Sequence, residues 1–167
     1  TTHDMGFDNV APFLLANDYD RIVSKDDYPP DRVLSALGVP DDYLYEHAVG
    51  DLDGLHQQGK PFFAAIMTGS DHGPFVIPDY FKPRHKEATL GIVEYVDWSV
   101  QKFLRLASQK PWFDNTIFVF VADHGSSLDK RYDMPLSSLH SPLIFYAPQL
   151  LGEPRSLPNL GSQVDVF

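Results

Sequence analysis

Runs of apolar residues between polar loops predict that strands and helices alternate along this chain. The runs Pro61–Met67 and Thr116–Ala122 are rich in β-branched and aromatic residues, which is typical of strands buried on both faces. A third apolar run, Pro142–Pro148, predicts another strand. Apolar residues at helical spacing predict a long helix over residues 87–109. A strand, a helix and a strand of these lengths form a βαβ unit, so we expect the first two strands to be parallel.

Two further helices are predicted nearer the beginning of the chain. A short helix is expected over residues 7–17, where apolar and small residues alternate with few polar ones. A longer helix is expected to begin at Pro40-Asp41-Asp42, because proline suits the first turn and acidic residues complement the helix dipole. We therefore interpret these two acidic residues as features of a helix start and not as ligands.

Composition and charge narrow the class of protein. The chain has 167 residues, the length of one ordinary domain, and 43% of them are hydrophobic. Its formal charge of −10 argues against a nucleic-acid partner, which would need a basic surface. No apolar run approaches the roughly 18 residues of a membrane span, so we expect this chain to be soluble. The absence of cysteine excludes disulfides and thiolate metal sites.

Polar side chains follow both of the first two predicted strands. Asp123, His124 and Gly125 come directly after Thr116–Ala122, and the loop Thr68–His72 follows the preceding strand. A carboxylate beside an imidazole suits a divalent metal such as zinc or manganese. The alternative is that the aspartate only caps a turn and the histidine is an ordinary polar residue. Because parallel strands end at one edge of a sheet, we expect the two loops to lie together.

Five short motifs, taken in order, resemble a known family. They are Thr68-Gly-Ser-Asp-His-Gly-Pro-Phe75, Tyr95-Val-Asp97, Asp114-Asn-Thr116 leading into Val121-Ala-Asp-His-Gly125, Pro142-Leu-Ile-Phe-Tyr-Ala-Pro148 and Ser162-Gln-Val-Asp165. Together they resemble the sulfatase-like branch of the alkaline phosphatase superfamily, most closely the lipoteichoic acid synthase and phosphoglycerol transferase group. The resemblance implies an α/β fold, with a mostly parallel sheet and helices on both faces. It also implies that residues 1–167 are an incomplete, C-terminal portion of one sulfatase-like catalytic domain.

The same resemblance implies roles for individual residues. Asp123 and His124 would ligate one divalent metal ion, manganese first, with zinc, magnesium or calcium as alternatives. His72 would contact the phosphate or glycerol part of the substrate and is the catalytic candidate in this chain. An early polar loop would add substrate contacts through His3 and Asp8. Lipoteichoic acid synthases carry a tryptophan where Asp8 falls and an arginine two residues later, so the same phosphoglycerol headgroup does not follow.

The activity implied by the resemblance is metal-dependent transfer or hydrolysis of phosphate or sulfate esters through a covalent enzyme intermediate. The nucleophilic threonine and an acidic metal ligand are expected upstream, because Thr1 and Thr2 lie too close to the early polar loop. We therefore expect the chain alone to be inactive. The substrate would be a phosphate or sulfate ester such as a lipid headgroup or glycan. The parent protein would be membrane-anchored, acting on the extracytoplasmic face of a bacterial membrane.

Two alternatives stay open at this point. One is a two-metal phosphodiesterase or phosphomutase of the same superfamily, in which His140 would be a ligand of the second metal. His140 could equally be a partner of a metal ligand or a plain loop histidine. The other alternative is an inactive binding module that keeps the fold without the nucleophile.

Overall fold

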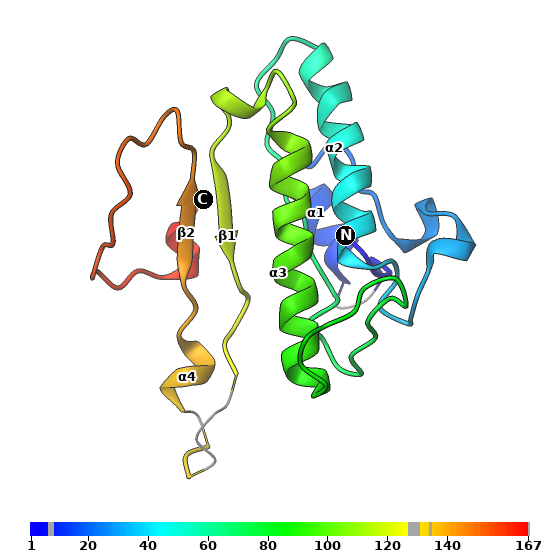
Figure 1. The fold of residues 1–167 in the computed structure, drawn as a ribbon. Helices are drawn as coiled ribbons and strands as arrows, with labels where there is room; N and C mark the ends of the chain where they lie inside the picture. Colours follow the sequence, from blue (N-terminus) through cyan, green and yellow to red (C-terminus); the bar gives the residue numbers. More distant parts are fainter. Residues whose placement is uncertain (7–8, 127–130, 134, 167) are drawn as a thin grey trace. The chain divides into compact units, whose positions relative to one another are not determined.

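The structure, a computed structural model, describes residues 1–6, 9–126, 131–133 and 135–166. It divides into two compact units, Thr1–Lys110 and Pro111–Phe167, which we call the first and the second unit (Figure 1). In chain order the helices and strands are α1 (Val10–Ala16), α2 (Asp41–Gln57), α3 (Ala88–Ala107), β1 (Phe118–Val121), α4 (Leu136–Leu139) and β2 (Leu143–Tyr146).

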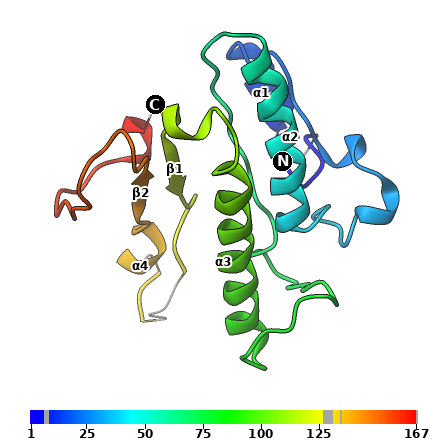
Figure 2. The same ribbon diagram turned by 45° about the horizontal axis from the view of Figure 1, so that its top comes forward.

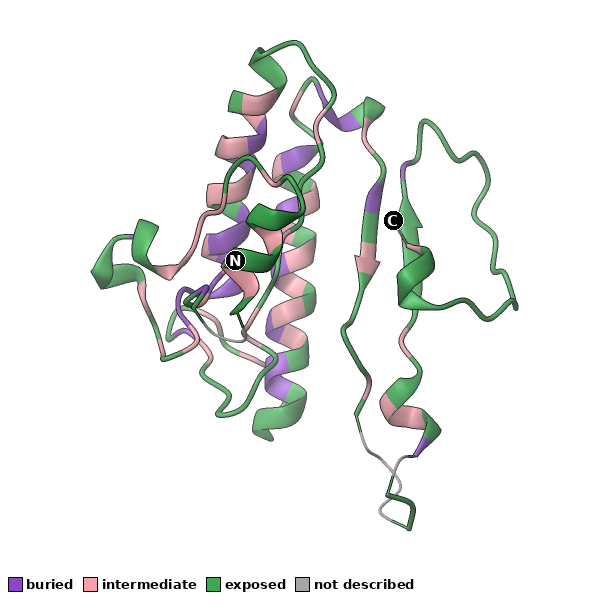
Figure 3. Cartoon of the chain, turned by 180° about the vertical axis from the view of Figure 1, so that it is seen from behind, coloured by how far each residue is buried: buried purple, intermediate pink, exposed green. Residues whose placement is uncertain are grey.

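The first unit is built around α2 and α3, which pack side by side (Figures 1 and 2). The Tyr45 ring of α2 stacks on the Phe103 ring of α3 with a centroid distance of 4.8 Å. Ile92 and Tyr95 of α3 are fully buried, and buried residues line both helices (Figure 3). The three predicted helices, α1 among them, are therefore confirmed. Burial of an apolar face holds the two long helices together.

The run Pro61–Met67 does not form the predicted strand. No strand partner for it occurs among residues that the structure describes, and most of its side chains are exposed. Ile66 is an exception, because it packs against a buried cluster of Tyr28, Val39 and Leu44. A strand needs a neighbour to accept and donate its ladder hydrogen bonds. The expected parallel βαβ unit is therefore not present in the described part of the chain.

The second unit contains the two remaining predicted strands. β1 and β2 form a two-stranded sheet, but they are antiparallel, with Phe118 opposite Tyr146 and Val121 opposite Leu143. The mostly parallel sheet expected from the resemblance is therefore not seen in this unit, whose two strands are antiparallel. The connection between β1 and β2 contains α4 of only four residues.

Aromatic side chains hold one end of this small sheet. Phe113 lies 5.3 Å from Phe118 and 6.3 Å from Tyr146, measured between ring centroids. Phe118 is buried, whereas Val119 and Val121 of the same strand are exposed. Burial on both faces, which the apolar run predicts, is therefore not seen along β1 in this unit (Figure 3).

Among the residues that the structure describes, no helix is both long enough and apolar enough to cross a bilayer.

Candidate functional site

The Asp-His pair lies where the sequence predicts, immediately after β1 in the second unit. The Asp123 side chain is 88% exposed and the His124 side chain 74% exposed. The backbone N–H of His124 donates to Asp123 Oδ1 at 2.8 Å, which fixes the two residues relative to each other. Both residues therefore present their side chains at the surface of this unit.

The His124 ring is held in one tautomer by its neighbour. His124 Nδ1 lies 2.9 Å from the carbonyl oxygen of Gly125. Because a carbonyl can only accept, Nδ1 carries the hydrogen and the lone pair of Nε2 is left for another partner. Nε2 lies 3.6 Å from Asp123 Oδ2. Two ligands of one tetrahedral ion, each about 2.1 Å from it, would be about 3.4 Å apart, so this donor pair fits a shared metal.

The backbone of the pair is fixed by side chains from later segments. Gln163 Nε2 donates to the carbonyl oxygens of Ala122 at 2.6 Å and Asp123 at 2.8 Å. On the other side of the chain, the N–H of Ala122 donates to Ser141 Oγ at 3.1 Å. These bonds replace the sheet ladder that ends at Val121, so the loop keeps a defined conformation after the strand.

Gly125 is required because the chain passes close to α4. A Cβ atom on Gly125 would lie 2.1 Å from the carbonyl oxygen of Ser137 and 2.9 Å from that of His140. The Gly125 N–H donates to the Ser138 carbonyl at 2.9 Å, which this close approach permits. His140 follows the last residue of α4 and is exposed. The predicted role of His140, either as a ligand of a second metal or as a partner of a metal ligand, stays a prediction.

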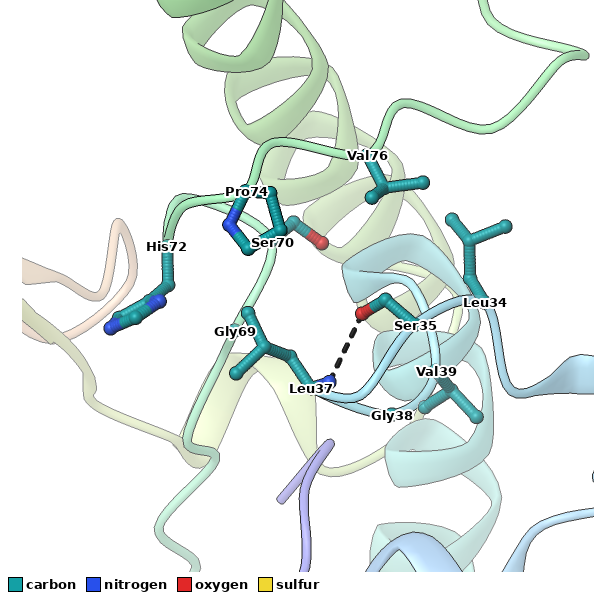
Figure 4. A pocket seen from close by; sticks show the side chains of 10 residues that line it. All are labelled: Leu34, Ser35, Leu37, Gly38, Val39, Gly69, Ser70, His72, Pro74 and Val76. Carbon is teal, nitrogen blue, oxygen red and sulfur yellow. Dashed lines mark hydrogen bonds between the residues drawn. The ribbon is translucent and has the colours of Figure 1, made fainter.

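His72, the predicted catalytic residue, lies in an exposed loop of the first unit. Its Nδ1 lies 2.8 Å from the carbonyl oxygen of Gly73, so this nitrogen donates, as in His124. Nε2 is consequently the atom that His72 offers to a ligand. Figure 4 shows the ring at the edge of a small hollow between residues 34–39 and 69–76, pointing away from Leu34 and Val76.

His3, a predicted substrate-binding residue, lies in the same unit and interacts with His72. The pKa of His3 is lowered, first by burial and also by the nearby His72, while Asp4 partly opposes this. His3 Nδ1 lies 3.1 Å from Thr1 Oγ1. The structure thus brings the two predicted histidines within electrostatic range of each other. Asp8, the third predicted substrate-binding residue, lies outside the described residues.

Comparison with known proteins places the chain in a family. The model of the sulfatase family matches residues 1–167. The chain belongs to the sulfatase family. A solved structure of a protein in the alkaline phosphatase superfamily from Vibrio parahaemolyticus is also similar, with a TM-score of 0.79 and 28% sequence identity. That match covers 87% of this chain but 36% of the Vibrio chain.

These matches confirm the α/β fold class and the superfamily that the sequence motifs indicate. They support phosphoryl or sulfuryl ester chemistry at the level of the family. Proteins of the sulfatase family generally bind a divalent metal ion. Within the described part of this chain, no group of three or more histidine, aspartate or glutamate side chains is arranged to hold an ion. An ion bound by Asp123 and His124 alone would have two protein ligands, fewer than the three or four of ordinary zinc sites.

Two functional candidates that the sequence analysis missed lie at the start of α2. Asp41 is completely buried, and its Oδ1 accepts from the backbone N–H groups of Gly69 at 3.0 Å and Ser70 at 3.1 Å. The sequence shows only a proline followed by acids, which predicts a helix start and gives no sign of a long-range contact. Burial raises the pKa of Asp41, and these hydrogen bonds partly oppose the rise.

Its neighbour Asp42 is also buried and is held by three side chains. Tyr95 and Tyr80 donate to its Oδ1 at 2.5 and 2.6 Å, and Lys102 Nζ lies 2.8 Å from its Oδ2. Burial alone would raise the pKa of Asp42, but the hydrogen bonds from Lys102, Tyr80 and Tyr95 outweigh it and hold the pKa below its ordinary value. Asp42 is therefore ionised at neutral pH and joins α2, α3 and the loop that contains Tyr80.

Proposed function

We propose that this chain forms part of a metal-dependent enzyme that transfers or hydrolyses phosphate or sulfate esters through a covalent enzyme intermediate. The observation that carries the proposal is the pair Asp123 and His124. Both side chains are exposed at the end of β1, and Nε2 of the histidine is available as a ligand atom. Membership of the sulfatase family supports the class of ester.

Asp123 and His124 would hold the metal ion together with ligands from outside these residues. Manganese is the ion we favour because the motifs resemble the lipoteichoic acid synthase group, and zinc, which imidazole also suits, is an alternative. When bound, the ion would supply positive charge to lower the pKa of a hydroxyl nucleophile and to stabilise the charge on the ester oxygens. Neither residue would then act as an acid or base, because the lone pairs of both are committed to the metal. We place the nucleophile outside this chain.

His72 would contact the non-bridging oxygens or the leaving group of the substrate. Its Nδ1 is occupied by the Gly73 carbonyl, so contact with the substrate would be made by Nε2. In the protonated form, Nε2–H would donate a charge-assisted hydrogen bond, which is stronger than a neutral one. His3 would be a second contact to the substrate, and its lowered pKa favours the neutral ring. A neutral ring can accept a hydrogen bond from a substrate hydroxyl.

The substrate class is proposed as a phosphoglycerol-type ester, such as a lipid headgroup, or the ester of a glycan. The protein that contains this chain would act in the manner of the lipoteichoic acid synthases, anchored in a bacterial membrane with its catalytic part on the extracytoplasmic side. The motif order supports this subgroup, and because the early loop lacks the tryptophan and the arginine, the proposal extends to phosphate esters with other headgroups.

The proposal is tested by turnover of two chromogenic esters by the whole protein, bis(p-nitrophenyl) phosphate and p-nitrophenyl sulfate, with manganese present. We expect hydrolysis of one of them, and loss of about 100-fold or more in kcat for Asp123→Asn, because that change removes a charged metal ligand. The control is Asp31→Asn, which removes an exposed carboxylate of the first unit. Turnover of neither ester, or equal turnover by Asp123→Asn and the control, would contradict the proposed chemistry.

A further inference from the structure

The loop that carries His72 is held at its beginning by a buried carboxylate. We define the His72 loop as residues 68–81. Asp41 Oδ1 accepts hydrogen bonds from the N–H groups of Gly69 and Ser70, and the Asp41 N–H donates in return to Ser70 Oγ at 3.1 Å. The first N–H groups of a helix have no acceptor within the helix, so Ser70 supplies one that α2 lacks. The start of α2 and the start of the loop are thus bonded in both directions.

The same part of the loop is enclosed from its other side by Thr2. A Cβ atom on Gly69 would lie only 2.5 Å from Thr2 Oγ1, so a larger residue would require the loop or Thr2 to move. Thr2 is completely buried, as is Asp41. Gly69 therefore lies between a fixed carboxylate and the residue that precedes His3. Any shift of this segment would change the distance between His3 and His72.

The far end of the His72 loop is held by the next carboxylate along α2. The Tyr80 hydroxyl donates to Asp42 Oδ1 at 2.6 Å, and Lys102 of α3 balances the charge of Asp42. Consecutive residues of one helix turn thus bind the two ends of a single loop. Between these ends, His72 is exposed and its ring contacts the carbonyl of the following residue.

An acidic residue can complement the helix dipole from the exposed surface of the first turn, without being buried. Asp41 does not face solvent, and no partner for its Oδ2 occurs among the described residues. Burying a carboxylate is costly unless it is compensated by hydrogen bonds. The cost of burying Asp41 is offset by hydrogen bonds from the backbone of the His72 loop and not from α2. This indicates that Asp41 serves the loop.

We propose that Asp41 is a positioning residue, which fixes the His72 loop against Thr2 and so sets the position of His72 relative to His3. This inference rests on the proposed function, because it gives His72 and His3 a common substrate. Asp41 touches neither histidine and acts through Gly69 and Ser70. A carboxamide in its place keeps an oxygen acceptor for both N–H groups, whereas a methyl group does not.

The test compares four variants of the whole protein in ester turnover: Asp41→Ala, Asp41→Asn, His72→Ala and Asp51→Ala. We expect Asp41→Ala to lower kcat about 100-fold with little change in KM, the size of effect that a misplacement of about 1 Å produces. Asp41→Asn should recover kcat to within about fivefold of the wild type, since both loop hydrogen bonds have an acceptor. Asp51→Ala is the matched control, because Asp51 lies on the same helix and pairs with Arg21 and His47, away from the loop.

Hydrogen exchange measured by mass spectrometry gives a second readout that does not depend on turnover. The peptide containing Gly69 and Ser70 should exchange at least about tenfold faster in Asp41→Ala than in Asp51→Ala, and nearly as slowly as wild type in Asp41→Asn. If Asp41→Ala does not fold, Ser70→Ala removes the reciprocal hydroxyl while leaving the carboxylate in place. It should change exchange and kcat in the same direction by a smaller factor.

The outcomes distinguish the positioning role of Asp41 from the proposed contact between His72 and the substrate. If Asp41→Ala matches Asp51→Ala in kcat and in exchange, the positioning role is overturned, whatever His72→Ala does. An Asp41→Asn variant as slow as Asp41→Ala would also overturn it, because the loss would then follow the charge and not the loop contact. If His72→Ala retains full turnover, the proposed function of His72 fails, and the exchange of Gly69 and Ser70 decides alone whether Asp41 holds the loop.

Discussion

Two tyrosines donate to the same carboxylate oxygen but differ in burial. Comparing them therefore tests how burial changes the stabilisation that one kind of hydrogen bond provides. Tyr95 and Tyr80 both donate to Asp42 Oδ1, at 2.5 and 2.6 Å. Tyr95 is fully buried, whereas Tyr80 is 62% exposed. Replacing each by phenylalanine removes one hydroxyl and no other atom. The two variants therefore differ mainly in whether water can take the place of the lost hydroxyl.

The two variants are expected to lose different amounts of stability, because water can replace the lost hydroxyl at only one of the two positions. A hydrogen bond to a charged group contributes about 1.5–3 kcal/mol when water cannot replace it. Tyr95 also accepts from the Asp42 N–H at 3.3 Å, so Tyr95→Phe leaves a buried donor without its acceptor. We expect Tyr95→Phe to lower the free energy of opening of the first unit by about 2–3 kcal/mol. Tyr80→Phe should cost about 0.5 kcal/mol, because water reaches the exposed position.

The assay is hydrogen exchange of the peptides from α2 and α3 in the whole protein, which reports the free energy of opening of these helices. Tyr19→Phe is a suitable control, since its ring contacts Phe63 outside the α2–α3 pair. A loss for Tyr80→Phe equal to or larger than that for Tyr95→Phe would refute the argument from burial. So would a Tyr95→Phe variant that exchanges like the control.

Three further changes follow from the contacts of the two units. Lys102→Met should destabilise the first unit at pH 7 by about 1–3 kcal/mol. Lys102 helps to hold the pKa of Asp42 below 3.8, so the difference in stability between variant and wild type should be present above that pH. In acid denaturation this difference should disappear as the pH falls below the lowered pKa. Gly125→Ala should cost about 1–3 kcal/mol in the second unit, since its Cβ would overlap the Ser137 carbonyl, and faster exchange of β1 would report it. Gln163→Leu should weaken manganese binding about tenfold in calorimetry, because the backbone after β1 loses its support; unchanged affinity would contradict this.

Elements with strong periodicity could be predicted from the sequence because their signals are local. α3 follows from apolar residues at helical spacing, and α2 from its proline and acids followed by a helical pattern. β1 and β2 follow from apolar runs that end in polar residues or proline. The pair Asp123 and His124 was found in the same way, because it stands directly after a strand. The family motifs then indicated the superfamily, which the comparisons confirm.

Features that depend on distant parts of the chain could not be predicted in this way. The run Pro61–Met67 has the composition of a strand, but a strand also needs a partner, and composition does not supply one. The antiparallel pairing of β1 with β2 depends on the connection between them and not on either run. Asp41 and Asp42 have the ordinary pattern of a helix start, so nothing local distinguishes two buried carboxylates with partners 28 to 60 residues away.

The most direct test of the central claim is the metal content of the whole protein, measured by elemental analysis after dialysis against manganese. We predict that the double variant Asp123→Ala/His124→Ala loses bound metal and ester turnover together, because both donors of the exposed pair are removed. His56→Ala, which removes an exposed histidine of the first unit, should retain both and serves as the control. A double variant that keeps its metal and its turnover would contradict the assignment of Asp123 and His124 as metal ligands.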